Sequence, residues 1–309
     1  LFTFRDLTRA IAWVIEMPYQ FLRNLLIEGF QTGLGDATVQ IAPSLSWIAV
    51  IAIVIGVGHT ARDWGLAALA GACFLYLAVF GQWDSAMVTL ASVLVAVPIG
   101  AVGGLLLGIL AYRRPWVERL LRPVLDLMQT VPVFAYLVPI LILFGFGPVA
   151  ALVATVIYAM PPMIRVTIVA LKGVPEELLE AARMMGATPR QMTWKVLVPA
   201  AVPTLMVGVN QVIMLTLNMV IIASMIGAGG LGFDVLASLR KLDIGGGIEA
   251  GLAIVVMAIA LDRTSQAFSE RRLWRQRTGN LLQRHPWSMI ALLAVSYTHL
   301  RAHETFGYL

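Results

Sequence analysis

The sequence predicts an all-α fold, a polytopic transmembrane helical bundle of about seven spans, and composition is the first reason. Of the 309 residues, 59% are hydrophobic and only 13% are charged, and the mean hydropathy is +0.84. A soluble protein does not need so apolar a composition, so the expected surroundings are a lipid bilayer. In addition, apolar residues gather in stretches that approach the ~30 Å hydrocarbon thickness, and basic residues cluster between them.

The first 40 residues are predicted to form an amphipathic segment ahead of the bundle. One helical face carries apolar side chains before Pro18 and another carries them after it, at Phe4, Leu7, Ile11 and Val14 and at Leu22, Leu25, Leu26 and Phe30. Because Pro18 interrupts helical hydrogen bonding, we expect two helices here. They either lie in the membrane interface or pack against the bundle. The chain opens on Leu1 rather than Met, so we expect an incomplete N-terminus.

Seven apolar stretches follow and define the predicted spans. They are residues 41–58, 65–80, 86–112, 124–145, 148–171, 200–225 and 248–262. The first two, within residues 41–84, are accessory helices, and the second is short enough that we expect it to tilt or to be re-entrant. The other five form a core of residues 85–268. In the third stretch, Gly100, Gly104 and Gly108 repeat on one helical face, which predicts close helix packing.

Basic residues orient the predicted spans. They cluster in three places: Arg113, Arg114, Arg119 and Arg122; then Arg183, Arg190 and Lys195; then Arg263, Arg271, Arg272, Arg275 and Arg277. With seven spans, all three clusters fall on one side, which the positive-inside rule identifies as the cytoplasm. Residues 1–40 are then on the periplasmic side. Residues 269–294 form a basic cytoplasmic segment that leads into an apolar run cut short.

The connection over residues 172–199 is too polar for lipid and reads as helix, glycine turn, helix. A narrow apolar stripe follows the first helix, at Leu178, Ala182 and Met185. Gly186 suits the left-handed residue that ends this helix. Thr188 is the expected N-cap of the second helix, with Pro189 just inside it, and Pro199 is expected to end it.

This connection also carries a spaced motif. Glu180-Ala181-Ala182, three residues, Gly186, nine residues and Val196-Leu197-Val198-Pro199 resemble the cytoplasmic signature loop of binding-protein-dependent ABC importers. Two valines stand where that pattern usually has Ile and Leu. In that family the loop is a coupling helix that docks on the nucleotide-binding subunit. The resemblance therefore implies an ATPase contact at Glu180, Ala181, Ala182, Gly186 and Pro199. An ordinary amphipathic loop helix would explain the caps and the stripe but not the full spacing.

Further motifs extend the resemblance over residues 85–268 and narrow it to glycine betaine/L-proline and choline permeases. They are Met128–Pro132, Tyr136–Pro139, Met160–Arg165, Gly208–Gln211 and Ile222–Gly227. Prolines such as Pro132 break helical hydrogen bonding and suit either a moving gate or a static kink. The polar residues Asn210, Gln211 and Asn218 stand in an apolar span. They either line the translocation path, as Pro132 would, or make interhelical hydrogen bonds.

The resemblance implies a multi-pass permease of the bacterial inner membrane that works by alternating access. Partner ATPase subunits would hold ATP and magnesium, and this chain would bind no cofactor. A periplasmic substrate-binding protein, a second copy of the chain and membrane lipid are the other expected partners, and nucleic acid is not expected. Import of another small substrate, such as an amino acid, is the alternative. An ion-coupled carrier is disfavoured, because the longer stretches lack acidic or basic residues near their middles.

The sequence indicates neither catalytic residues nor a metal site. Cys73 is the single cysteine, so no disulfide forms within the chain. The glycines at 227, 229, 230 and 232 lack the preceding strand and the Gly-Lys-Ser/Thr sequence of a nucleotide loop. His299 and His303 have a spacing that zinc can use. However, residues 296–305 resemble a translated sequencing adapter, so we expect residues 295–309 not to be native.

Overall fold

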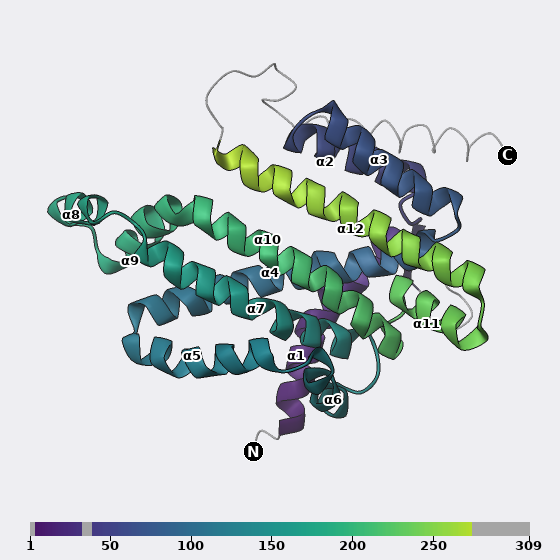
Figure 1. Ribbon diagram of the computed structural model, residues 1–309, viewed down its shortest axis with the longest axis horizontal. Helices are drawn as coiled ribbons and strands as arrows, with labels where there is room; N and C mark the ends of the chain where they lie inside the picture. Colours follow the sequence, from purple (N-terminus) through teal and green to yellow (C-terminus); the bar gives the residue numbers. More distant parts are fainter. Residues whose placement is uncertain (1–3, 33–38, 274–309) are drawn as a thin grey trace. The chain divides into compact units, whose positions relative to one another are not determined.

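The computed structural model describes residues 4–32 and 39–273 and confirms the all-α class (Figure 1). The helices are α1 (Phe4–Arg23), α2 (Trp47–Ala61), α3 (Trp64–Val79), α4 (Trp83–Arg113), α5 (Pro115–Thr130), α6 (Val133–Phe144), α7 (Pro148–Lys172), α8 (Glu176–Met184), α9 (Pro189–Gln191), α10 (Val198–Ala223), α11 (Leu231–Lys241) and α12 (Ile244–Leu273). Wider π-helical stretches are η1 (Asn24–Glu28), η2 (Met192–Leu197) and η3 (Ser224–Ala228). Two short strands, β1 (Phe30–Thr32) and β2 (Val39–Ala42), pair antiparallel and were not predicted. The expected non-native tail lies outside the described residues.

Helix lengths revise the predicted spans. Within residues 4–32 and 39–273, four helical runs are long and apolar enough to cross a membrane: α4, α7, the continuous run Pro189–Ala223 and α12 as far as Phe268. A fifth arises if α5 and α6, bent by 105°, form one broken span. α2 and α3 have 15 and 16 residues, so each is only about 22–24 Å long. By length the structure therefore supports five of the seven spans at most, and crossing by α2 and α3 stays a prediction.

The predicted span over residues 124–145 is wrong as a single helix. It begins within α5, and the chain breaks where Val131 takes an extended backbone with ψ of 132° and Pro132 becomes the N-cap of α6. The residue before a proline avoids the helical region because the proline ring clashes with it. The Tyr136 hydroxyl donates to the Met128 carbonyl across the break. This bond helps to hold the bend.

The first span and the N-terminal segment also differ from prediction. α1 continues through Pro18 instead of breaking there. A single proline removes only one backbone donor, and the bonds on either side maintain the helix. The span expected from residue 41 starts at Trp47, where the Ser46 hydroxyl caps α2 by accepting from the Ala49 N–H at 3.3 Å. An exposed apolar face on α1, at Trp13, Val14, Met17 and Phe21, agrees with an interfacial helix.

Contacts divide the described residues into two compact units. Unit 1 comprises residues 4–17 and 92–228, and unit 2 comprises residues 18–32, 39–91 and 229–273. The sequence had assigned residues 229–268 to one core with α4–α10. In the structure, α11 and α12 group by contact with α2 and α3, because α12 packs against both of these helices, and the predicted extent of the functional core stays a prediction.

Unit 1 is built around a glycine-lined seam, which we define as the contact of Gly104 and Gly108 on α4 with Met163 and Thr167 on α7. A Cβ added to Gly104 would lie 2.6 Å from Met163 Cβ, and one added to Gly108 would lie 2.5 Å from Thr167 Cβ. The predicted packing role of these glycines is thus confirmed. α10 also lies alongside α7 (Figure 1), and Gly208 on α10 leaves no room for a Cβ beside the same Met163.

Within unit 2, the first turns of α4 contact the glycine loop that precedes α11. The Leu231 N–H donates to Thr89 Oγ1 at 3.1 Å. Gly230 has φ of 91°, and a Cβ there would lie 2.6 Å from Thr89 Oγ1. This glycine therefore serves a tight turn against α4.

Candidate functional site

The first element of the candidate site is α8, which lies with α9 at the end of unit 1 seen at the left of Figure 1. We call residues 173–191 the tip. α8 spans nine residues and has Glu176 and Glu177 in its first turn, where carboxylates complement the positive end of the helix dipole. Gly186 has φ of 75°, as expected for a left-handed helix stop, so the predicted glycine turn is confirmed.

The second element begins as predicted. Thr188 caps α9 by accepting from the Gln191 N–H at 3.3 Å, and Gln191 Oε1 accepts from the Thr188 N–H at 2.9 Å. This reciprocal pair is a capping box, which satisfies backbone donors that the first helical turn leaves free. The turn between the two helices is therefore held by local hydrogen bonds.

Pro199 does not end the second helix, which corrects the prediction. The chain runs from α9 through η2 directly into α10, with Pro199 in the first turn of α10. Just before it, the Val198 N–H donates to the Thr193 carbonyl five residues earlier. A π turn of this kind widens the helix. We attribute the continuation of the helix past Pro199 to the extra room that this gives the proline ring.

Burial separates the motif residues into two groups. Glu180, Ala181, Gly186 and Pro199 are exposed, whereas Ala182 is only 2% exposed. Ala182 therefore packs inside unit 1 in this conformation, and the expected partner contact at this residue stays a prediction. Its small side chain lets α8 approach its own unit closely.

The predicted apolar stripe of α8 is also only partly correct. Leu178 and Met185 are exposed by 47% and 81%, and Met184 by 85%. Leu179, not Leu178, packs with the core of unit 1. In a nine-residue helix, residues 179 and 182 share one face at i, i+3 spacing, which leaves the other apolar side chains outside. The tip thus carries an exposed apolar patch of Leu178, Met184 and Met185.

Ion pairs join the base of the tip to α5, and the sequence had not indicated them. Lys172 Nζ and Arg122 Nη2 both contact Glu118 Oε1 at 2.7 Å. Glu118 lies in the first turn of α5, ahead of the apolar stretch. Hydrogen bonds from Lys172 and then from Arg122 hold the pKa of the Glu118 carboxyl below its usual range. A second pair, Arg165 with Asp126, also links α7 to α5.

These contacts bear on the predicted topology. Arg113 Nη2 at the end of α4 donates to the Pro189 carbonyl at 3.2 Å, and Glu118 contacts Lys172 at the end of α7. The basic segment around residues 113–122 and the connection 172–199 therefore share one end of unit 1. The sequence had placed both on the cytoplasmic side, and this arrangement agrees with it.

The candidate path residues lie in two places. Gln211 and Asn218 are exposed and, seven residues apart on α10, share one helical face. Asn210 is half-buried on the adjoining face, where its Nδ2 lies 4.0 Å from Met214 Sδ. Pro132 is on another element, at the α5–α6 bend. The structure thus groups two of the four residues on one face and leaves their role a prediction.

Among residues 4–32 and 39–273, no group of three or more His, Cys, Asp or Glu side chains is arranged to hold a metal ion. His299 and His303 lie outside these ranges.

The sequence of this chain is similar to those of known transport permeases. The family described as "binding-protein-dependent transport system inner membrane component" matches residues 100–274. The glycine betaine/proline betaine transport system permease protein ProW of Escherichia coli is 45% identical over 267 residues, which cover 84% of this chain and 73% of that protein. The trimethylamine N-oxide transport system permease protein TmoV of Pelagibacter ubique is 40% identical over 293 residues, covering 90% of this chain and 40% of that protein.

The chain therefore spans well under half the length of the trimethylamine N-oxide relative. Among solved structures, inward-facing conformations of the MetNI methionine ABC transporter give a TM-score of 0.54 at 26% identity, covering 60% of this chain and 92% of that chain. The family description and the apolar helices locate the chain in the bacterial inner membrane as a multi-pass protein. Because the matched residues are more than half of the sequence, the chain belongs to the binding-protein-dependent transport system inner membrane component family.

Proposed function

We propose that this chain is the permease subunit of an ATP-driven importer for small trimethylammonium osmolytes of the glycine betaine type. The exposed tip carries the proposal, because it combines a signature-like motif with an apolar surface that the described part of the chain leaves uncovered. The chain would supply the translocation path for the substrate and the tip that transmits movement of the ATPase. ATP and magnesium would be bound by partner ATPase subunits, and the chain itself would hold no cofactor and catalyse no reaction.

The surface chemistry of the tip supports docking of an ATPase subunit. Met184 and Met185 are the most exposed apolar side chains of the tip. Exposed apolar patches rimmed by charge are typical of protein–protein contacts, and methionine adapts well to a partner surface. Glu180 and Arg183 supply the charged rim on α8. Movement of the partner would reach α10 directly, because η2 joins the tip to α10 without a break.

The exposed polar face of α10 supports a homodimer with the path near its interface. Gln211 and Asn218 occupy the same face as the exposed residues Val207 and Met214. An amide side chain facing lipid would lack hydrogen-bond partners, which is unfavourable. A second copy of the chain, or water in a path between two copies, would satisfy these amides. Two copies would also present two tips to two ATPase subunits.

The substrate class rests on the relatives. Glycine betaine and proline betaine are named for the Escherichia coli protein, and the glycine betaine transport system permease protein OpuAB of Bacillus subtilis is 43% identical over 240 residues. Trimethylamine N-oxide is the second candidate, because two relatives carry that name at 40% and 43% identity. Both molecules contain a trimethylated nitrogen. Discrimination between them would reside mainly in the binding protein, where aromatic faces can hold such a cation.

The test is ATP-dependent uptake into proteoliposomes that contain the chain, its neighbouring ATPase and its binding protein. Labelled glycine betaine and labelled trimethylamine N-oxide are supplied in parallel. We expect ATP-dependent uptake of one or both, lost in the variants Glu180→Lys and Gly186→Asp. The matched control Glu177→Lys places the same charge change on the same helix outside the motif and is expected to retain uptake.

Three results would overturn parts of this proposal. Uptake driven by an ion gradient without the ATPase would exclude the ATP-driven mechanism. ATP-coupled uptake of an amino acid but of neither trimethylammonium compound would keep the mechanism and change the substrate. Equal loss of uptake in Glu177→Lys would remove the special role of the motif.

Homodimerisation has a separate test that uses the single cysteine. In a Cys73→Ala background, we expect Asn218→Cys to form cross-linked dimers with a short bifunctional thiol reagent in native membranes. Leu110→Cys, on an exposed position of α4, is the control and is expected to stay monomeric. Cross-linking of both variants to the same extent would contradict the proposed interface.

A further inference from the structure

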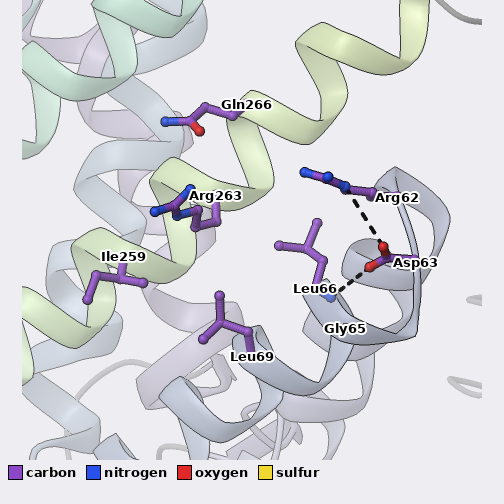
Figure 2. Close-up of a pocket in the computed structure, with 8 residues that line it drawn as sticks. All are labelled: Arg62, Asp63, Gly65, Leu66, Leu69, Ile259, Arg263 and Gln266. Atoms are coloured by element: carbon purple, nitrogen blue, oxygen red, sulfur yellow. Dashed lines mark hydrogen bonds and ion pairs between the residues drawn. The ribbon is translucent and has the colours of Figure 1, made fainter.

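Unit 2 contains a cavity of ≈ 400 Å³ between the turn that joins α2 to α3 and the last turns of α12 (Figure 2). Arg62, Asp63, Arg263 and Gln266 supply its polar lining. Its apolar lining comes from Leu66 and Leu69 on α3 and from Ile259 on α12. On α3 and α12, the apolar lining residues lie farther from the α2–α3 turn than the polar ones do (Figure 2). The cavity is therefore polar at one end and apolar at the other.

The polar end carries an excess of positive charge. Asp63 is the carboxylate in the lining, and it already accepts from the Leu66 N–H at 2.9 Å and lies 3.8 Å from Arg62 Nε. Arg263 forms no ion pair or hydrogen bond with any residue in the described ranges. Asp262, the next carboxylate on α12, accepts from Gln266 Nε2 at 2.7 Å. Among the lining residues, the charged side chains are therefore two arginines and one aspartate, which sum to one positive charge.

The position of the cavity along the chain matches a membrane surface. Trp64, directly after the charged turn, is 70% exposed, and its ring lies against that of His59 in a tilted arrangement with ring centroids 4.2 Å apart. Exposed tryptophans are typical of the boundary between lipid and water. The predicted topology places Arg62 and Arg263 on the cytoplasmic side, and the structure brings both into one cavity. The cytoplasmic leaflet is the one in which basic residues meet anionic lipid headgroups.

We propose that this cavity binds one anionic phospholipid, with the phosphate between Arg62 and Arg263 and the start of an acyl chain along Leu66, Leu69 and Ile259. A phosphodiester with one negative charge complements the single excess positive charge of the lining. Arginine suits this role because its planar guanidinium can donate two parallel hydrogen bonds to phosphate oxygens. The apolar end gives the lipid an advantage over a free anion, since free phosphate has nothing to bury there.

The experiment measures lipid retention by the purified full-length chain in detergent, by native mass spectrometry. Phosphatidylglycerol and phosphatidylcholine with identical acyl chains are supplied at equal concentration, and inorganic phosphate is supplied in a separate arm. We expect one tightly retained phosphatidylglycerol. In the double variant Arg62→Gln/Arg263→Gln, its affinity should fall by roughly tenfold.

The control Arg240→Gln changes an exposed arginine of unit 2 outside the cavity and should retain the lipid. Thermal unfolding of each variant shows whether it is folded, and Leu69→Gln offers a second route by removing the apolar contact while both arginines remain. Unchanged retention in the double variant would overturn the proposal. So would equal retention of phosphatidylcholine, or displacement of the lipid by equimolar inorganic phosphate. The assay uses the chain alone and is independent of the transported substrate.

Discussion

The seam and the tip of unit 1 differ in how closely their glycines and methionines are packed. In the seam, Gly104 and Gly108 bring α4 so close to α7 that an added Cβ would overlap Met163 or Thr167. At the tip, a Cβ added to Gly186 would meet nothing within 4 Å, and Met184 and Met185 are exposed by 85% and 81%. The difference indicates that substitutions in the seam act on stability, whereas substitutions at the tip act on coupling. Four predictions test this division, from the largest expected effect to the smallest.

Adding one methyl group to the seam should have the largest effect. In Gly108→Ala the new Cβ would lie 2.5 Å from Thr167 Cβ, and one helix must shift. We expect a loss of about 1–3 kcal/mol of stability, measured by thermal unfolding of the purified chain. Gly100→Ala is the matched control, because its Cβ would meet its nearest neighbour, Val212 Cγ1, at 3.4 Å. Equal unfolding midpoints for both variants would refute the close-packed seam.

Polar substitution of the tip should leave stability unchanged and impair coupling. We expect Met184→Ser/Met185→Ser to weaken ATPase binding by about tenfold, because exposed apolar side chains become buried only on docking. Copurification of the ATPase and its titration onto the permease measure this effect. Leu120→Ser, on an exposed position of α5, is the control. A lower unfolding midpoint with normal ATPase binding would show that the patch supports the fold instead.

Removing the cap of α9 should have a smaller effect, because it lowers local helix stability within the tip. Thr188→Ala deletes the oxygen that accepts from the Gln191 N–H. The expected loss is about 1 kcal/mol of local helix stability, visible as faster hydrogen exchange over residues 188–192. Thr188→Ser keeps the hydroxyl and should behave as the parent protein. Unchanged exchange in Thr188→Ala would mean that neighbouring contacts alone hold the tip.

The Glu118 ion pairs should have the smallest effect, with a defined pH dependence. Because they are partly exposed to solvent, Glu118→Gln should cost at most about 1 kcal/mol at neutral pH. The pKa of Glu118 is lowered in the folded chain, so this contribution is complete above the unfolded value of about 4.3. It is lost as the pH falls further, through the lowered folded pKa. The midpoint difference between parent and variant should therefore shrink between pH 6 and pH 3.5, and a constant difference would contradict the ion-pair account.

Local signals at the tip predicted much of its structure. The left-handed glycine at 186 and the cap at Thr188 depend on neighbours within a few residues, and both were correct. The buried face of α8 was assigned incorrectly. Its periodicity allowed either Leu178 or Leu179 to face inward, and the contact of α8 with η2 selected Leu179 and Ala182.

Prolines also show that local sequence signals do not determine the structure on their own. Pro132 stands at a 105° bend, Pro199 lies inside a continuous helical run, and Pro18 leaves α1 unbroken. Sequence alone treats each as a helix breaker. The outcome depends on whether the surrounding chain offers another hydrogen bond or more room, as the π turn before Pro199 does.

By itself, the sequence determined that this chain is an apolar helical membrane protein with a polar helix–turn–helix connection, because composition, periodicity and caps act locally. It also predicted that Gly104 and Gly108 face another helix, although not which one. The tertiary structure alone decided the partners of those glycines, the pairing of Glu118 with Lys172, the burial of Ala182 and the meeting of Arg62 with Arg263. Each of these depends on residues far apart in the chain, whose approach is set by helix packing rather than by local preference.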